Sequence, residues 1–345
     1  MTGLRWATSE AEPGAIAAAL RDAVDGASLA LENVALLQAA VGEEGIAAAR
    51  HEIAAAFEGE PPPCHLVRQS PAGGRGIAAL LWLYEGPVVR SGAVASIGRG
   101  PGRLHFVDGV SAPTGDVGAQ WERCFGSLDA ALREAGLAAS SLVKLWTYYG
   151  SAGGDGHFPE FSAYRNRRFS RARFSIAPDS GGRGLPASTG VRTGGRESAL
   201  GAVAASVAEA RAVSNPLQAD PHRYRPPMHP AWFSRGVRVE LDGEGLLLAG
   251  GTASVVGSSV VHEGDVAEQV EQVLDLLDAL RRAAAGGGAA RCGYMVVYVR
   301  DRDDVGVVRG ILDAHFPTVP TLVIVAPLSR SDLLVEIDSA AIVTA

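Results

Sequence analysis

A fifteen-residue segment occurs twice in this chain, and this repeat limits the folds that the sequence can adopt. DVGAQWERCFGSLDA begins at Asp116 and DVAEQVEQVLDLLDA begins at Asp265, and the two align without a gap at seven identical positions. Both copies have apolar positions compatible with an amphipathic helix. Each follows an apolar, strand-like run, LHFVDG ending at Gly109 and LLLAGG ending at Gly251. The chain therefore contains an internal duplication.

The same further elements are predicted after each copy of the repeated helix. A second strand begins at Leu142 (LVKLWTYYG) in the first copy and at Tyr294 (YMVVYVRD) in the second. A second helix follows, and in the second copy its acidic start, DDVGVVRG, suits the positive end of the helix dipole. Each copy then reaches a proline, Pro186 or Pro320, and a closing section. The predicted fold class is α+β, with two units that pack helices on one face of a mixed sheet.

The regions outside the repeat give weaker signals. AIAAALRDAVDGASLALENVALLQAAV and GIAAARHEIAAAF are compatible with Ala-rich helices and GIAALLWLYEG with a strand, so residues 1–100 are assigned to an accessory N-terminal region. Residues 101–213 form the first unit and residues 236–345 the second. Residues 214–235 between them are rich in Pro, His, Arg and aromatic side chains. Because a flexible linker favours Gly and Ser, we expect this segment to be ordered and to line a site.

Composition excludes several classes of function. With 31 basic against 38 acidic residues and a net charge of -7, the chain is unsuited to nucleic acid. The first residues lack the pattern of a signal peptide, and no apolar run reaches the roughly 18 residues of a membrane span. We therefore expect a cytoplasmic protein without membrane contact. Cys64, Cys124 and Cys292 are widely spaced, which favours neither disulfides nor zinc, and no metal is predicted. The scarcity of Lys is typical of GC-rich coding and is given no functional weight.

The element order, with its DVxxQ helix and a closing strand that carries VEID, resembles the RidA-like (YjgF, chorismate-mutase-like) fold in both halves from Leu104 onward. Two such units with NPLQADPHRYRP, FSRG, GGTASVVG, YVRDRDD, FPTVP and SRSDLLVEID in that order resemble the chorismatase family over roughly residues 100 to 343. The resemblance implies an enzyme of secondary metabolism that cleaves the enolpyruvyl ether of chorismate by general-acid protonation and water attack. It implies chorismate as a small-molecule substrate, pyruvate and a dihydroxycyclohexadienoate as products, and no cofactor.

Glu336 is the predicted catalytic acid. In LLVEIDS, Glu336 and Asp338 share one face of a strand, while Val335 and Ile337 point the other way. From the sequence alone a solvated strand face is the alternative, and it is the resemblance that assigns the family's acid to Glu336. Protonation of the ether's methylene carbon needs a carboxyl group that stays protonated near neutral pH, which an apolar pocket favours. The matching place in the first unit is Ala202, so one site per chain is expected.

The two carboxylates of chorismate require at least two cations, and the paired donors of Arg suit a planar carboxylate. Arg330, six residues before Glu336, and Arg235, at the entrance to the second unit, are the first candidates. Arg168 represents a third source, the segment YRNRRFSRARF, which holds five arginines between residues 165 and 173. A solvated basic helix face is the alternative for that segment, although at least one of its arginines is expected to meet a carboxylate of the protein or of the ligand.

Three further residues are candidate substrate contacts. Tyr224 is expected to form a hydrogen bond to a ligand oxygen, and packing in the core or the linker is the alternative. Ala253 lies in a turn after a strand, where small residues let a ligand approach the backbone. Family members that aromatise the ring resemble a pattern with Gly in this turn and Cys before the Arg, whereas this chain has Ala253 and Ser329. The extra methyl restricts ring placement and the hydroxyl suits a bound water, which favours hydrolysis.

Other functions and assemblies stay open at this point. The nearest alternative is a 3-hydroxybenzoate synthase, which also releases pyruvate from chorismate, and a second is a non-catalytic RidA-like module that binds a small metabolite. A RidA-type deaminase is disfavoured, because those enzymes carry an Arg soon after the proline of the closing strand and here Thr321 and Leu322 follow Pro320. The chain is expected either to be a monomer with pseudo-symmetric repeats, a degenerate third copy in the accessory region being one option, or to form a homo-oligomer.

Overall fold

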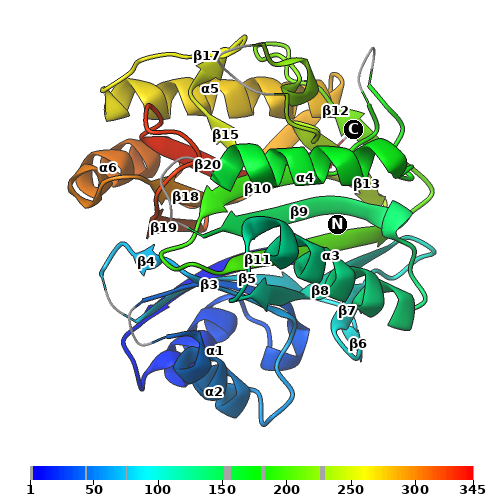
Figure 1. Cartoon of the computed structure of the whole chain (residues 1–345). Coiled ribbons are helices and arrows are strands. Elements are labelled where there is room, and N and C mark those ends of the chain that lie inside the picture. Colours follow the sequence, from blue (N-terminus) through cyan, green and yellow to red (C-terminus); the bar gives the residue numbers. More distant parts are fainter. Residues whose placement is uncertain are drawn as a thin grey trace.

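The computed structural model describes residues 3–42, 45–74, 76–150, 157–179, 183–225 and 230–344. Three sheets with their helices follow one another along the chain and occupy the bottom, centre and top of the view in Figure 1. We call them the N-terminal unit (residues 4–84), the middle unit (89–206) and the C-terminal unit (210–344).

All three units share one connectivity. Each contains a strand, helix, strand, helix, strand and strand, and in each sheet these four strands are ordered first, fourth, second, third. Of these pairings, second with third is parallel, and the other two are antiparallel. The predicted fold class, α+β with mixed sheets, is confirmed. The N-terminal unit adds a third copy of the topology to the two that the sequence predicts.

The elements have the following bounds. In the N-terminal unit they are β1 (Leu4–Ala11), α1 (Ile16–Gly26), β2 (Val34–Val41), α2 (Ile46–Ala56), β3 (Cys64–Arg68) and β5 (Ile77–Tyr84). In the middle unit they are β8 (Arg103–Ala112), α3 (Val117–Glu134), β9 (Leu142–Tyr149), α4 (His157–Arg171), β10 (Ala187–Arg192) and β11 (Ser198–Ser206). In the C-terminal unit they are β14 (Glu244–Ala249), α5 (Val266–Ala285), β18 (Ala289–Val299), α6 (Val305–His315), β19 (Thr321–Val325) and β20 (Val335–Thr344).

Shorter strands extend these sheets. Beside β8 lie β7 (Val94–Ile97) and β6 (Val89–Ser91), and beside β14 lie β13 (Gly236–Leu241) and β12 (Ala210–Val213). The two-residue strand β15 (Thr252–Ala253) pairs with β20, and β16 (Val255–Val256) forms a hairpin with β17 (Ser259–Val260). From the N-terminal unit, β4 (Ser70–Pro71) pairs with β19 and so joins the first unit to the third.

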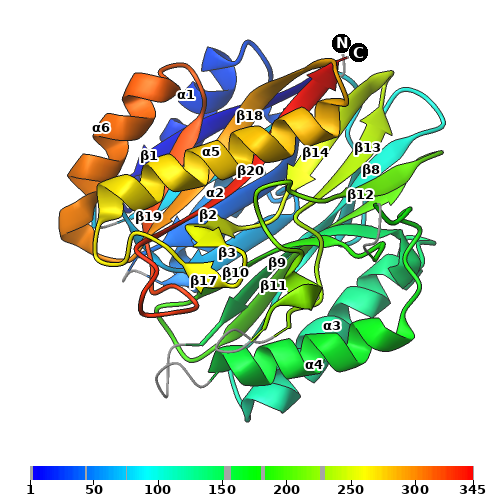
Figure 2. The same cartoon turned by 90° about the horizontal axis from the view of Figure 1, so that it is seen from above.

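Both faces of the central strands are buried, because helices cover one face and the other units cover the opposite one. In β5, Ile77 and Leu81 pack in the core beneath α1 and α2. Leu80 and Trp82 of the same strand lie in a second core to which all three units contribute. The same arrangement is visible in Figure 2, where α5 lies across the outer face of the C-terminal sheet. The prediction of helices on one face of each sheet is thus confirmed.

One strand of the N-terminal unit contradicts the sequence prediction. The Ala-rich run over residues 15–41 is compatible with a helix, and α1 does occupy Ile16–Gly26, but Val34–Val41 is the strand β2 between β5 and β3. All eight residues of β2 are buried. A strand buried on both faces lacks the alternation of polar and apolar residues that separates a strand from a helix in sequence. The helix at Ile46–Ala56 and the strand at Ile77–Tyr84 are as predicted.

The Asp of the repeated DVxxQ segment caps the helix in both units. Asp116 accepts a hydrogen bond from the backbone N–H three residues on at 2.8 Å, and Asp265 does the same at 3.1 Å. These contacts satisfy a backbone donor that a helix leaves free at its first turn. At the other end of α5, Gly286 adopts the left-handed conformation (φ 59°) in which helices commonly end.

The Gln of DVxxQ holds the loop that leads into the fourth strand. The Gln269 Oε1 atom accepts a hydrogen bond from the Leu334 N–H at 2.9 Å, and its Nε2 donates to the Asp332 carbonyl at 3.0 Å. Gln120 makes the equivalent pair of contacts to the backbone before β11. Both side chains are buried. The repeated motif therefore fixes the position of residues 329–333, which line the pocket described below.

Replacement of Gln269 by Ala is expected to lower the free energy of unfolding by about 2 to 4 kcal/mol, because it leaves buried backbone groups of the loop without partners. The exposed Asp275, on the same helix, is the matched control, and Asp275→Ala should change the free energy by less than about 0.5 kcal/mol. Urea unfolding of the two variants measures both values. Equal stabilities would show that Gln269 does not hold the loop.

Candidate active site

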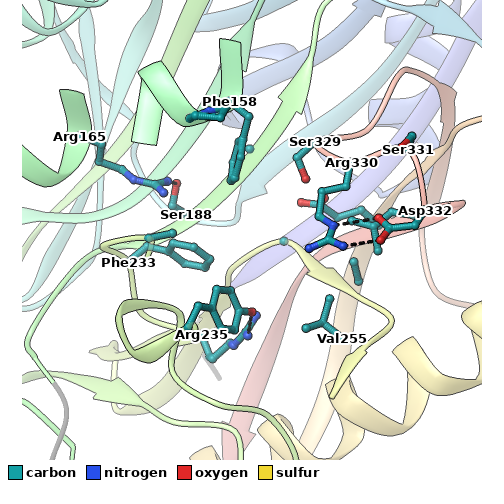
Figure 3. Close-up of a pocket in the computed structure, with 18 residues that line it drawn as sticks. Phe158, Arg165, Ser188, Phe233, Arg235, Val255, Ser329, Arg330, Ser331 and Asp332 are labelled. Atoms are coloured by element: carbon teal, nitrogen blue, oxygen red, sulfur yellow. Dashed lines mark hydrogen bonds and ion pairs between the residues drawn. The ribbon is translucent and has the colours of Figure 1, made fainter. Parts of the chain in front are cut away.

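A pocket of about 340 Å³ lies between the middle and the C-terminal units. The middle unit contributes side chains from α4 and β10, and the C-terminal unit contributes β15, β20 and the loop before β20. Figure 3 shows Phe158 and Arg165 on one side of the pocket and Arg330 with Asp332 on the other. Six of the seven predicted site residues line it: Glu336, Arg330, Arg235, Tyr224, Ala253 and Ser329.

Glu336 projects from β20 toward the pocket. Its neighbours Val335 and Ile337 pack in the core beneath α5 and α6, as the predicted alternation requires. Glu336 itself is only 6% exposed and Asp338 is completely buried, so the alternative of a solvated strand face is wrong. Gly251 packs directly against the carboxyl group, since a Cβ atom at that position would lie 2.0 Å from Glu336 Oε1. A residue other than Gly at 251 would displace the acid.

The surroundings of Glu336 favour its protonated form. Burial raises the pKa of this carboxyl group from 4.5 to about 8, and the negative charge of Asp338 adds to the shift. A hydrogen bond from the Gly190 N–H and the positive charges of Lys144 and Arg235 act in the opposite direction without reversing it. At neutral pH the group therefore holds a proton that it can donate into the pocket.

Arg165 is a buried cation, and no acid of the described residues forms an ion pair with it. Its side chain is 2% exposed, and its guanidinium carbon lies 4.7 Å from the ring centre of Phe161 and 5.1 Å from that of Phe233. One contact joins Nη1 to the Ser188 hydroxyl at 3.5 Å, while Nε and Nη2 have no hydrogen-bond partner among the described residues. Burial lowers the pKa of Arg165 to about 9. A buried guanidinium with free donors is suited to receive an anion.

Arg235 is a second buried cation at the same pocket. It is 4% exposed, and its Nη2 donates to the Ala219 carbonyl at 3.0 Å and to the Tyr224 hydroxyl. Its Nε atom has no partner, and no ion pair within the described part of the chain involves Arg235. Tyr224 thus lines the pocket and accepts a hydrogen bond from Arg235, and its contact with a ligand oxygen stays a prediction.

The remaining predicted arginines are engaged by acids of the protein. Arg330 lines the pocket, but its Nε donates to Asp332 Oδ1 at 2.8 Å and its Nη2 donates to the other oxygen of the same carboxylate. This contact lowers the pKa of Asp332. Arg168 lies outside the pocket lining and pairs with both oxygens of Asp129, at 2.6 and 2.7 Å. Within the arginine-rich helix α4, Arg165 is the one that reaches the pocket.

The corresponding interface between the N-terminal and middle units is closed. Glu336 pairs across the sheet with Tyr298, and the residue that pairs in the same way with Tyr148 is Ala199, which replaces Ala202 as the counterpart of the acid. A Cβ atom on Gly201 would lie 2.3 Å from a ring nitrogen of His65, so this imidazole occupies the space. The cavity left there measures about 20 Å³, enough for little more than one water.

Three other observations concern metal ligands, cysteines and membrane-spanning helices. Among the described residues, no group of three or more His, Cys, Asp or Glu side chains is arranged to hold a metal ion. The three cysteines are buried free thiols. No helix in the described ranges is long and apolar enough to cross a membrane.

The architecture is that of the chorismatase fold. A crystal structure of a chorismatase matches 90% of this chain and 93% of its own length with a TM-score of 0.62, at 22% sequence identity. At this identity the match identifies the fold.

In sequence the chain is 31% identical over 222 residues to a chorismatase from Streptomyces rapamycinicus, which covers 59% of this chain and 64% of that protein. It is 28% identical over 259 residues to a 3-hydroxybenzoate synthase from Streptomyces hygroscopicus, which covers 69% of this chain and 73% of that protein. The chain therefore spans just under two thirds of the length of the first relative. No protein-family model matches it. The predicted relationship is confirmed, and the chain is a homologue of chorismatases and 3-hydroxybenzoate synthases.

The raised pKa of Glu336 predicts a pH-dependent stability. Because the folded protein holds this proton up to about pH 8 while the unfolded chain releases it near 4.5, the stabilisation is complete below about pH 4.5 and is lost as the pH rises through 8. The unfolding free energy of the wild type minus that of Glu336→Gln should thus fall by about 3 to 5 kcal/mol between these limits. Urea unfolding across this range measures the difference. A constant difference would show that the carboxyl group titrates normally.

Proposed function

We propose that this protein is a chorismatase, which hydrolyses chorismate to pyruvate and a dihydroxycyclohexadienoate. The observation that supports this most strongly is one pocket in which a protonated, buried carboxyl group faces two buried arginines that have no acid partner among the described residues. Chorismate requires both features, since it carries an acid-labile enol ether and two carboxylates. The homologues whose names are chorismatase and 3-hydroxybenzoate synthase agree with this substrate.

In this proposal Glu336 is the general acid. Its proton is transferred to the terminal methylene carbon of the enol ether, which becomes a methyl group, and the ether carbon becomes an oxocarbenium ion. A water molecule adds to that carbon and loses a proton to the Glu336 carboxylate. The resulting hemiketal breaks its bond to the ring oxygen, which takes up a proton. One water is consumed, and pyruvate and the ring diol are released.

In this proposal Arg165 and Arg235 hold the two substrate carboxylates. Arg330 contributes less to substrate binding, because Asp332 already pairs with it. The positive charge of Arg235 acts on Glu336, so we assign to Arg235 the enolpyruvyl carboxylate, which is bonded next to the carbon that receives the proton. Arg165 then receives the ring carboxylate. The pocket volume of about 340 Å³ lies in the range of small-molecule sites.

The alternative product is 3-hydroxybenzoate, and the homology to a 3-hydroxybenzoate synthase favours it. In that route the ring hydroxyl, instead of water, attacks the cation, and the ring becomes aromatic as pyruvate leaves. Ala253 and Ser329 both line the pocket. The Ala253 methyl restricts the position of the ring, and the Ser329 hydroxyl suits a bound water, so we place hydrolysis first. A metabolite-binding module without catalysis is the remaining alternative.

Incubation of the protein with chorismate tests the proposal. Pyruvate should appear in a lactate dehydrogenase-coupled assay, and chromatography should show the dihydroxycyclohexadienoate as the main ring product. Glu336→Gln, which keeps the shape of the side chain but has no proton to donate, should lower kcat by roughly 100-fold or more. Mainly 3-hydroxybenzoate would establish the alternative product, and absence of pyruvate would leave the binding module.

The Arg165→Met variant tests whether Arg165 binds the substrate or stabilises the fold. Because the buried guanidinium has no acid partner in the part of the chain that the structure describes, the variant is expected to raise the unfolding free energy of the ligand-free protein by about 1 to 3 kcal/mol. It should also lower kcat/KM for chorismate about 30-fold or more, since one substrate carboxylate loses its cation. Arg167→Met, at an exposed position of the same helix, is the control and should change neither value appreciably. A less stable Arg165→Met protein with normal kcat/KM would assign this arginine a structural role.

A further inference from the structure

The only lysine of the sequence lies in the interior, behind the candidate acid. Lys144, on β9, is completely buried, although the other basic residues of this chain are all arginines. Its ammonium group donates to three acceptors: the Asp338 Oδ2 atom at 2.5 Å, the Thr189 hydroxyl at 3.0 Å and the Ala249 carbonyl. Three N–H donors thus meet three acceptors from three strands, β20, β10 and β14. A guanidinium, which is planar and larger, does not match this arrangement.

Asp338 is the acid at the centre of this cluster. Its Oδ2 atom accepts hydrogen bonds from Lys144, from the Thr189 hydroxyl and from Trp146 Nε1, the last at 3.2 Å. Its Oδ1 atom accepts one from the Tyr294 hydroxyl at 2.8 Å. Both carboxylate oxygens thus act as acceptors, and all four of these contacts are donated by the surrounding side chains. The pair is therefore a buried ion pair that joins the middle unit to the C-terminal unit.

Each residue that accepts a hydrogen bond from Lys144 lies one or two positions along the chain from Glu336 or from a residue that contacts Glu336. Thr189 precedes Gly190, whose N–H binds the Glu336 carboxyl group. Asp338 lies two residues beyond Glu336 on the same face of β20. Ala249 lies two residues before Gly251, which packs against the carboxyl oxygen. The ammonium group thus connects the three backbone segments that surround the acid.

We propose that Lys144 is a positioning residue for Glu336: through Thr189, Asp338 and Ala249 it holds the strands that place the acid. Through its charge it also balances Asp338, and the pair together sets how firmly Glu336 holds its proton. The inference that this affects catalysis rests on the proposed function. Neither Lys144 nor Asp338 lines the pocket, so both act through Glu336 and not by touching the substrate.

The charged and titratable groups that act on Glu336 come from β20, β9, β18 and the segment before β13. Asp338 on β20 raises the pKa of Glu336, whereas Lys144 on β9 and Arg235 before β13 lower it, with Asp338 exerting the largest effect of these three. Among the described residues, the other groups that interact electrostatically with Glu336 are the hydroxyls of Tyr149 on β9 and Tyr298 on β18, both fully buried and neutral, because burial raises the pKa of each. Of the charged groups, Arg235 lines the pocket, whereas the Lys144–Asp338 pair lies outside the lining and can be changed without removing a pocket residue.

The test compares the pH profiles of three proteins. Asp338→Asn removes the anion but leaves the cation, so Glu336 should lose its proton at lower pH, and the alkaline limb of kcat/KM should move down by about one to two pH units. Adding Lys144→Met removes the cation as well, so the double variant should lie between Asp338→Asn and the wild type. The expected order of the limbs is wild type, double variant, Asp338→Asn, from high to low pH. In both variants KM should change less than about threefold while kcat falls.

Leu145→Val is the matched control, because Leu145 is equally buried on β9 but faces the core beneath α3 and α4. It should reduce stability without moving the limb. Any other order of the three limbs, or the same shift in Leu145→Val, would overturn the proposal. If Asp338→Asn does not fold, the comparison of the wild type with the double variant is sufficient. The proposal then requires the alkaline limb of the double variant to lie at lower pH than that of the wild type.

A second readout does not depend on turnover. The difference in unfolding free energy between each protein and its Glu336→Gln partner, followed against pH, reports the titration of Glu336 itself. Its midpoint should follow the same order in the three backgrounds. If chorismate is not cleaved but the order holds, the proposed function fails and the positioning role stands. If chorismate is cleaved and the midpoints coincide, the positioning role fails and the function stands.

Discussion

The structure depends on one core that three sheets share. Trp6 and Trp82 of the N-terminal unit, Trp146 of the middle unit and Tyr294 of the C-terminal unit meet there, with ring centres 5.2 to 6.3 Å apart. Large aromatic rings in edge contact remove much apolar surface from water, which is the main force holding the units together. Because every unit gives one sheet face to this core, its helices must cover the other face, and polar groups between the sheets have to satisfy one another. The buried Lys144–Asp338 ion pair and the neutral carboxyl group of Glu336 are two ways in which polar groups between the sheets meet this requirement.

The sequence predicts the fold well where the side chains of a motif make hydrogen bonds that the fold requires. Asp265 caps a helix and Gln269 binds a loop, and the equivalent residues of the middle unit make the same contacts, so the repeat can be recognised in the sequence. The N-terminal unit has the same topology without that motif, and its central strand Val34–Val41 is buried along its whole length, with Gln38 as its one polar residue. Burial on both faces removes the alternation from which a strand is recognised, which is why a helix is the wrong prediction for that segment.

For the site, residues near Glu336 in sequence or marked by a family motif were predictable, and most of them do line the pocket. What the sequence does not reveal is which charges are already neutralised. Arg330 and Arg168 look as available as Arg165 until the structure shows Asp332 and Asp129 beside them. One signal is present in the sequence, although base composition also accounts for it: a chain that uses arginine everywhere else retains a single lysine. A compact ammonium in a confined space explains that exception better than codon usage does.

The closed interface at His65 and Gly201 shows what three units in one chain permit. In an assembly of three identical subunits, every substitution would occur at all three interfaces at once. Three units in one chain are free of that coupling. Ala199 and Glu336 occupy equivalent positions yet can diverge independently, one toward packing and the other toward chemistry. Within one chain, the interface that holds Glu336 can therefore form a pocket while the interface at His65 is filled by side chains.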